Sequence, residues 1–208
     1  MVTVYGVITA GYAGTYNSEL YNANNGLFIA DGDYSIMLYR VPGNVIPEGA
    51  VVGETVVKAY AKVALFKGLI QLTYENVQGA TLEIVSEPSR AFVSNEVTLD
   101  AMPSKMTDLS RQAKITGEVT SVSKTIDGAN DVTVAVKVSD SFTMNVFLKK
   151  QAGWDYAALA TALAVGNKVE VKGFIAIYDA NADGSPAKYA SSTGWQIVNP
   201  TSAAVVAE

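Results

Sequence analysis

The clearest candidate for chemistry in this sequence is a short run of oxygen-bearing side chains, Asp179, Asn181 and Asp183. Oxygen ligands at alternate positions ahead of a glycine match the first half of the EF-hand calcium loop, where carboxylates and carbonyls surround a hard cation. The twelfth position of that loop is Ala190 rather than a bidentate glutamate, and no helical pattern flanks the run. We therefore favour a solvated loop over a calcium site, and we expect no other cofactor.

The residue types give little support to catalysis. The chain contains no His and no Cys, which removes the commonest general base and all thiol chemistry. Acid–base work would then need paired carboxylates, and the close pair Asp31 and Asp33 flanks a glycine at a predicted hairpin tip, where both are solvated. The sequence has no Gly-x-Ser-x-Gly elbow, Walker A loop or Rossmann glycine pattern. We expect a protein that is not an enzyme.

Binding of single-stranded nucleic acid needs exposed aromatic rings beside positive charge. The first half of the chain offers the residues best suited to this, which are Tyr12, Tyr16, Tyr34, Lys58 and Lys62. However, the net charge is −5, and residues 1–87 carry four Lys and Arg against eight Asp and Glu. Phosphate binding normally leaves a basic footprint. Nucleic-acid binding is therefore an alternative function, ranked behind protein contacts.

Tyrosine is enriched at protein interfaces, and the loop over residues 10–26 carries Tyr12, Tyr16 and Tyr21 among asparagines and glycines. Together with the loop over residues 179–193 and the apolar tail, it is a predicted contact surface. The tail contributes Val205 and Val206. Further interface candidates come from the last predicted strand, which contains Trp195. That ring would also stack on a sugar if the chain binds carbohydrate.

The elements that must position these residues occur in two similar copies. Gly117 follows Gly6 by 111 residues, each glycine lying inside a strand-like run. Gly166 follows Gly53 by 113 residues, and each of these glycines is followed three residues later by a valine. Two landmarks that repeat at nearly one offset indicate two copies of one small β domain. A chain of 208 residues fits two domains of that size.

Alternating apolar and polar residues predict the strands of each copy. In the first copy they cover residues 2–9, 27–30, 34–39, 55–65 and 69–74, and a last segment, 81–85, closes the copy. In the second copy they cover residues 114–124, 131–138, 143–148, 169–177 and 195–198, with a short Ala- and Leu-rich helix over 155–163. Five strands with a helix between the third and fourth is the order of the OB-fold.

Several of these runs also resemble a known group of modules. Residues 4–9, residues 25–32 and the glycine landmarks are similar to OB-fold modules found in tandem in surface and secreted proteins of Bacteroidetes-type bacteria. Residues 96–102 resemble the lead-in segment of such modules. The first copy departs from the pattern because no helix is predicted between Pro47 and Gly53. The resemblance implies a fold, and it implies no catalytic residues.

The sequence thus predicts an all-β protein with minor α content, built as two tandem OB-fold-like Greek-key barrels. The barrels occupy residues 1–87 and 113–208, and residues 88–112 form a linker with a short helix or turn near 99–109. The expected function is a non-enzymatic structural or interaction module, a subunit docked on other proteins in a virion, filament or cell-surface layer. Single-stranded nucleic acid and carbohydrate remain the alternative ligands.

Location follows from weaker signals. No apolar window approaches the roughly 18 residues of a membrane span, and the chain enters a predicted strand at Val2 without the pattern of a signal peptide. The hypothesis that the chain is a subunit of a larger assembly favours an extracellular, cell-surface or virion location over the cytoplasm.

Overall fold

The computed structural model describes residues 1–10, 26–42, 49–148 and 155–206. The first barrel is built from five strands, β1 (Val2–Ala10), β2 (Gly26–Asp31), β3 (Tyr34–Tyr39), β4 (Val56–Phe66) and β5 (Leu69–Thr73). They are ordered β1-β2-β3-β5-β4, and β4 pairs back onto β1 to close the barrel. A sixth strand, β6 (Thr81–Ile84), lies along β4 outside the closed ring.

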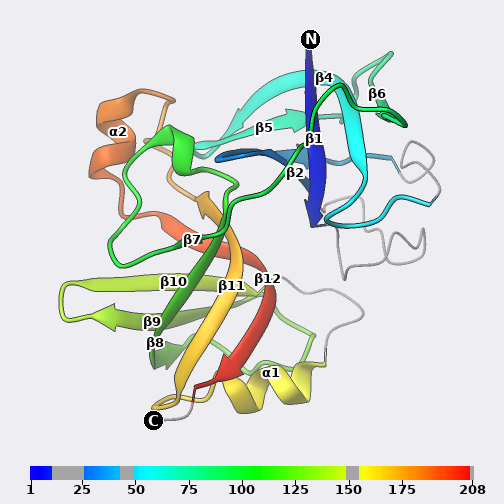
Figure 1. Ribbon diagram of the computed structural model, residues 1–208. Helices are drawn as coiled ribbons and strands as arrows, with labels where there is room; N and C mark the ends of the chain where they lie inside the picture. Colours follow the sequence, from blue (N-terminus) through cyan, green and yellow to red (C-terminus); the bar gives the residue numbers. More distant parts are fainter. Residues whose placement is uncertain (11–25, 43–48, 149–154, 207–208) are drawn as a thin grey trace.

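The second barrel repeats this layout (Figure 1). Its elements are β8 (Gln112–Val122), β9 (Val132–Ser139), β10 (Phe142–Leu148), helix α1 (Tyr156–Ala162), β11 (Lys168–Ile177), helix α2 (Pro186–Ser191) and β12 (Trp195–Val205). The order β8-β9-β10-β12-β11 is closed by β11 on β8, and β12 runs parallel to β10 as β5 does to β3. The predicted fold class of two tandem OB-like barrels is therefore confirmed.

The two glycines in the first strands perform the same task in each barrel. A Cβ atom at Gly6 would lie 2.9 Å from the carbonyl oxygen of Ala30 on β2. A Cβ atom at Gly117 would lie 2.3 Å from the carbonyl oxygen of Lys137 on β9. Only a residue without a side chain lets these strands approach so closely.

The second pair of glycines starts the fourth strand of each barrel. Gly53 and Gly166 both have positive φ, 83° and 91°. The Gly53 N–H donates to the carbonyl of Ile8 at 2.7 Å, and the Gly166 N–H donates to the carbonyl of Val119 at 2.9 Å. Equivalent glycines thus make equivalent hydrogen bonds, which confirms that the sequence repeat is a structural one.

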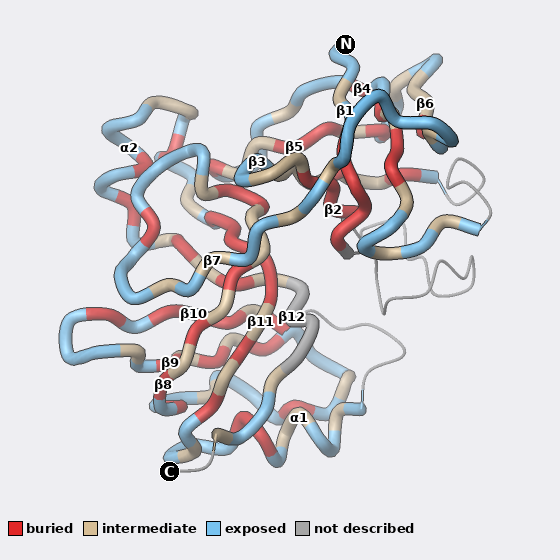
Figure 2. Tube along the Cα trace, viewed as in Figure 1, coloured by how far each residue is buried: buried red, intermediate tan, exposed pale blue. Residues whose placement is uncertain are grey.

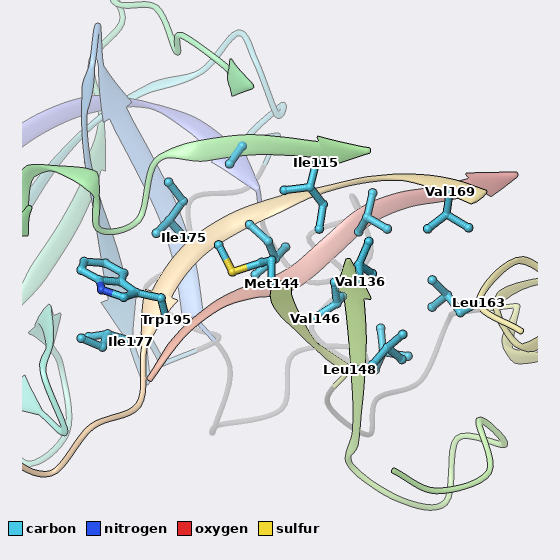
Figure 3. Close-up of a cluster of buried hydrophobic side chains, with 14 of the residues drawn as sticks. Ile115, Val136, Met144, Val146, Leu148, Leu163, Val169, Ile175, Ile177 and Trp195 are labelled. Carbon is cyan, nitrogen blue, oxygen red and sulfur yellow. The ribbon is translucent and has the colours of Figure 1, made fainter. Parts of the chain in front are cut away.

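Each barrel encloses its own apolar core, visible as buried stretches in the strands of Figure 2. Side chains of a strand point alternately inward and outward, and the burial of β10 and β8 follows that alternation closely. Leu163 follows α1 and is buried at one end of the second core (Figure 3). Other core residues drawn there are Ile115, Val136, Met144, Val146, Leu148, Val169, Ile175, Ile177 and Trp195.

Three segments differ from the expectations. The last strand was expected over residues 195–198, but β12 continues through the apolar tail to Val205, and Ala203 pairs with Val171 of β11. The loop over residues 179–193 was expected to have no helix, and it contains α2, with Pro186 at its start. The linker holds β7 (Val97–Thr98), parallel to β8, and a single 3₁₀ turn, η3 (Met106–Asp108).

No helix among the described residues is both long and apolar enough to cross a membrane.

Candidate binding surfaces at the junction of the two barrels

The two barrels share a buried interface built from outward-facing side chains. Phe28 of β2 stacks on Phe174 of β11, with ring centroids 4.2 Å apart and planes at 17°. Met37 of β3 and Val198 of β12 pack against this pair. The outward face of strands β2 and β3 is the ligand-binding face of many OB barrels. In the first barrel the second barrel covers the centre of that face.

A second contact inserts the β4–β5 turn into the second barrel (Figure 1). The turn residues Lys67 and Gly68 have φ of 48° and 87°, the conformation of a tight hairpin turn that matches strand twist. The Asp179 N–H donates to the carbonyl of Lys67 at 2.8 Å, and the Tyr189 hydroxyl donates to the carbonyl of Gly68 at 2.6 Å. A Cβ atom on Gly68 would lie 2.7 Å from that of Ala182. The turn is therefore held in one position.

The linker fastens the β2–β3 hairpin from the other side. Arg90 forms a two-pronged ion pair with Asp31, and this hydrogen-bonded guanidinium lowers the pKa of the Asp31 carboxyl. Arg111 and Asn95 both donate to Oδ1 of Asp33, at 3.2 and 3.1 Å. The two carboxylates that sequence reasoning considered for acid–base chemistry are thus ion-paired to the linker.

One end of the first barrel presents an apolar surface, which we call the apolar mouth and define by Tyr34, Val63, Leu65 and Met106. All four side chains are exposed, Tyr34 by 69%. Leu65 is paired with Ile70 across β4 and β5, and Ile70 lines a hollow of about 200 Å³. The remaining lining comes from β3, η3 and the residues beside them: Tyr34, Ser35, Ile36, Met106, Thr107 and Leu109. The lining contains no charged side chain.

The opposite face of β4 carries alternating rings and lysines. Val57, Ala59 and Ala61 point into the core, so Tyr60 and Lys62 point outward, and both are exposed. At the end of the strand, Phe66 meets Tyr178 edge to face with centroids 6.3 Å apart. Lys67 places its ammonium 4.1 Å from the centre of the Tyr178 ring. We call Tyr60, Lys62, Phe66, Lys67 and Tyr178 the β4 track.

The structure corrects one predicted interface residue. Trp195 is only 1% exposed, and its indole N–H donates to the carbonyl of Tyr189. The ring lies in the second core (Figure 3), because β12 turns this residue inward beside Ile197. A contact with a partner subunit or stacking on a sugar is therefore excluded for this residue.

The other interface candidates have different outcomes. Tyr12, Tyr16 and Tyr21 lie outside the described residues. Val205 is exposed at the end of β12 although its backbone pairs with β11. Val206 is partly exposed, and its N–H donates to the carbonyl of Lys168 at 2.9 Å. A contact role for these residues stays a prediction.

The residues proposed for nucleic-acid binding are not brought together as a set. Lys58 and Lys62 point outward from β4, whereas Tyr34 lies in the apolar mouth. Lys58 also faces Glu83 at 3.5 Å. Sequence reasoning missed the better partners, Phe66 and Tyr178. The signal for Phe66 was its strand parity with Tyr60 and Lys62, but no pattern in the sequence places Tyr178 beside it.

Asp179 and Asp183, two of the three residues considered for calcium, accept hydrogen bonds from other residues of the same loop. Asp179 accepts from the Ser192 hydroxyl at 2.6 Å and from the Asn181 N–H at 2.8 Å, and these bonds, that from Ser192 first, lower the pKa of Asp179. Asp183 accepts from the Ser185 N–H at 3.0 Å at the start of α2. Among the described residues no group of three or more acidic, His or Cys side chains is arranged to hold a metal. A solvated loop without calcium stays the prediction for these residues, and calcium binding is the alternative to be tested.

Comparisons with known proteins leave the ligand open. No family model matches the sequence, and no curated protein matches it either. Among solved structures, the chain is similar to a murine DNA-binding protein bound to double-stranded DNA, at 8% identity and a TM-score of 0.39, over 98% of this chain and 96% of that one. A likeness this weak carries no argument about function. The comparisons give no support to the resemblance to Bacteroidetes surface proteins.

Proposed function

We propose that this protein is a non-enzymatic structural module that docks other protein subunits through the apolar mouth. The supporting observation is that Tyr34 and Met106 are exposed apolar residues that line an uncharged hollow. Val63 and Leu65 add exposed apolar side chains on β4, where Leu65 pairs with the lining residue Ile70. Exposed apolar patches of this kind mark interaction sites on soluble proteins. Fully burying a leucine or valine side chain is worth about 1.5–3 kcal/mol, so a partner that covers the mouth gains several such contributions.

The rigid junction supports the same proposal. Both hairpins that border the mouth are fixed, one by the second barrel and one by the linker. A partner therefore loses little free energy in ordering this surface, since preorganisation lowers the entropic cost of binding. Two barrels held in one arrangement also present two different faces to two neighbours. A virion shell, a filament or a cell-surface layer is the setting that we propose for such a subunit.

Light scattering across a concentration series tests the proposal, with a second copy of this chain as the partner. We expect the wild-type mass to rise above the 21.9 kDa of one chain. The Leu65→Lys variant should stay monomeric, because the lysine places a charge in the mouth. Val165→Lys is the control, since Val165 is also an exposed apolar residue, at 64% against 47% for Leu65, but follows α1 in the second barrel. A wild type that stays monomeric, or equal behaviour of both variants, would contradict the proposal.

A further inference from the structure

We infer that the β4 track is a binding site for single-stranded nucleic acid, on the side of the first barrel opposite to the usual OB ligand face. The usual face, on β2 and β3, is covered by the second barrel at Phe28. The outward face of β4 is open to solvent at Tyr60, Lys62 and Phe66. A strand advances about 3.3 Å per residue, so Tyr60 and Phe66 are roughly 20 Å apart along β4, the length of a short strand of nucleotides.

The chemistry of the track fits bases and phosphates in alternation. Phe66 and Tyr178 are exposed by 53% and 54%, and exposed rings stack on unpaired bases of any sequence. Lys62 lies between Tyr60 and Phe66 on the same face, and Lys67 lies beside the ring pair. Both lysines are placed to contact the phosphates that connect stacked bases.

The neighbouring strand widens the site. Tyr5 of β1 is exposed and lies opposite Lys58, and Thr3 lies opposite Tyr60. On the other side of β4, the cross-strand partner of Lys62 is the neutral Thr73. Among the described residues that pair with β4 on β1, β5 and β6, one is acidic, Glu83, and it lies opposite Lys58. The acidic balance of the first half therefore does not extend to this face.

The lysines of the track are available to a ligand. No carboxylate among the described residues forms an ion pair with Lys62 or Lys67. Lys67 instead donates to the Tyr178 hydroxyl and lies over its ring. The carboxylate of Asp179, the nearest acidic residue in the sequence to Tyr178, is hydrogen-bonded to Ser192.

The same composition argues against a protein partner on this face. Lysine is depleted in protein interfaces, whose centres are apolar and aromatic, whereas the β4 track combines two lysines with three aromatic residues. The track is also independent of the apolar mouth. Val63 and Leu65 of the mouth point to one side of β4, and Lys62 and Phe66 point to the other. Failure of the nucleic-acid inference would thus leave the assembly proposal standing, and the reverse also holds.

A fluorescence-anisotropy titration with a labelled oligothymidine tests the inference. Binding should weaken with salt, with a slope of log affinity against log salt of about −1.4, because the two lysines of the track (62 and 67) each contribute about −0.7 for a single strand. Tyr60→Leu, Phe66→Leu and Tyr178→Leu should each weaken binding, by roughly 5- to 150-fold where the lost ring stacks on a base. Lys62→Gln should reduce the slope by about 0.7.

Matched controls separate the track from general effects. Tyr34→Leu removes an exposed ring on the other surface, and Lys137→Gln removes an exposed lysine of the second barrel; both should bind like the wild type. Circular dichroism melting checks that every variant is folded. The inference is overturned by the absence of saturable binding at about 50 mM salt, by equal affinity for a duplex of the same length, or by losses in the controls as large as those in the track variants.

Discussion

Phe28 on β2 and Phe174 on β11 lie with their rings stacked, with centroids 4.2 Å apart, although the two residues belong to different barrels. Both side chains are fully buried, yet neither points into the core of its own barrel, since Leu27 and Ile29 occupy the inward positions of β2. Each barrel therefore uses an outward aromatic residue to cover the other. Because of this contact, the outward face of β2 and β3 in the first barrel is covered, whereas the outward face of β4 is open to solvent.

The first prediction concerns this stack. Phe174→Ala should lower the free energy of unfolding by about 3–5 kcal/mol, the usual cost of deleting a buried phenylalanine. Phe174→Leu keeps most of the apolar volume and should cost clearly less. Urea unfolding followed by circular dichroism measures both changes. A loss of less than about 1 kcal/mol for the alanine variant would mean that the barrels do not depend on each other at this contact.

The second prediction concerns the β4–β5 turn. Gly68→Ala combines a positive φ with a clash against Ala182, whereas Gly53→Ala has a similar φ of 83° and no atom within 4 Å of its Cβ. Gly53→Ala should cost about 1–2 kcal/mol for the left-handed backbone. Gly68→Ala should cost about 1–3 kcal/mol more, because of overpacking. Equal losses in thermal or urea unfolding would show that the turn is not packed against the second barrel.

The third prediction is an acid-sensitive junction. The pKa of Asp31 is lowered in the folded protein by its hydrogen bond to Arg90. A lowered folded-state pKa gives stability that is complete above the unfolded pKa, near 3.8, and that is lost as pH falls through the folded value. Asp31→Asn should therefore be less stable than the wild type at pH 7, and the difference should shrink below pH of about 4. A difference that is constant with pH would argue against the ion pair.

The fourth prediction addresses the loop with Asp179, Asn181 and Asp183. The Asp179 carboxylate accepts one hydrogen bond on each oxygen, and no group of three or more acidic side chains among the described residues is arranged to hold a metal. We expect the melting temperature to be the same in millimolar calcium and in chelator. A rise with calcium that disappears in Asp183→Asn would instead establish a metal site, because ligands that bind only the folded state stabilise it.

The sequence pattern predicted the strands of both barrels well, because each strand is determined by the residues within it and by the glycines beside it. Strand alternation located β4 and β5, and the repeated glycines at 53 and 166 placed the fourth strands. The contacts between barrels could not be predicted in this way. Phe28 has the outward parity of a surface residue, and nothing near it in the sequence indicates that Phe174 covers it.

The site was predicted less well for the same reason. Lys62 was identified from residue type, but Tyr178, which contacts Phe66 at the end of the β4 track, is more than a hundred residues away from β4 in the sequence. Trp195 was expected at an interface as a residue of the last predicted strand, but its side chain points into the core of the second barrel. The loop over residues 179–193 was expected to contact other subunits, and its α2 region contacts the first barrel of the same chain through Tyr189; a contact with another subunit stays a prediction.

The central claim is that the apolar mouth is a contact surface between protein chains, and site-specific crosslinking tests it most directly. The chain has no cysteine, so a photoreactive label can be placed at a single introduced cysteine. Met106→Cys puts the label in the mouth, and Thr143→Cys puts it on the exposed face of β10. We predict a crosslinked dimer on illumination of the labelled Met106→Cys protein and none from Thr143→Cys. No dimer from Met106→Cys, or equal yields from both positions, would contradict the claim.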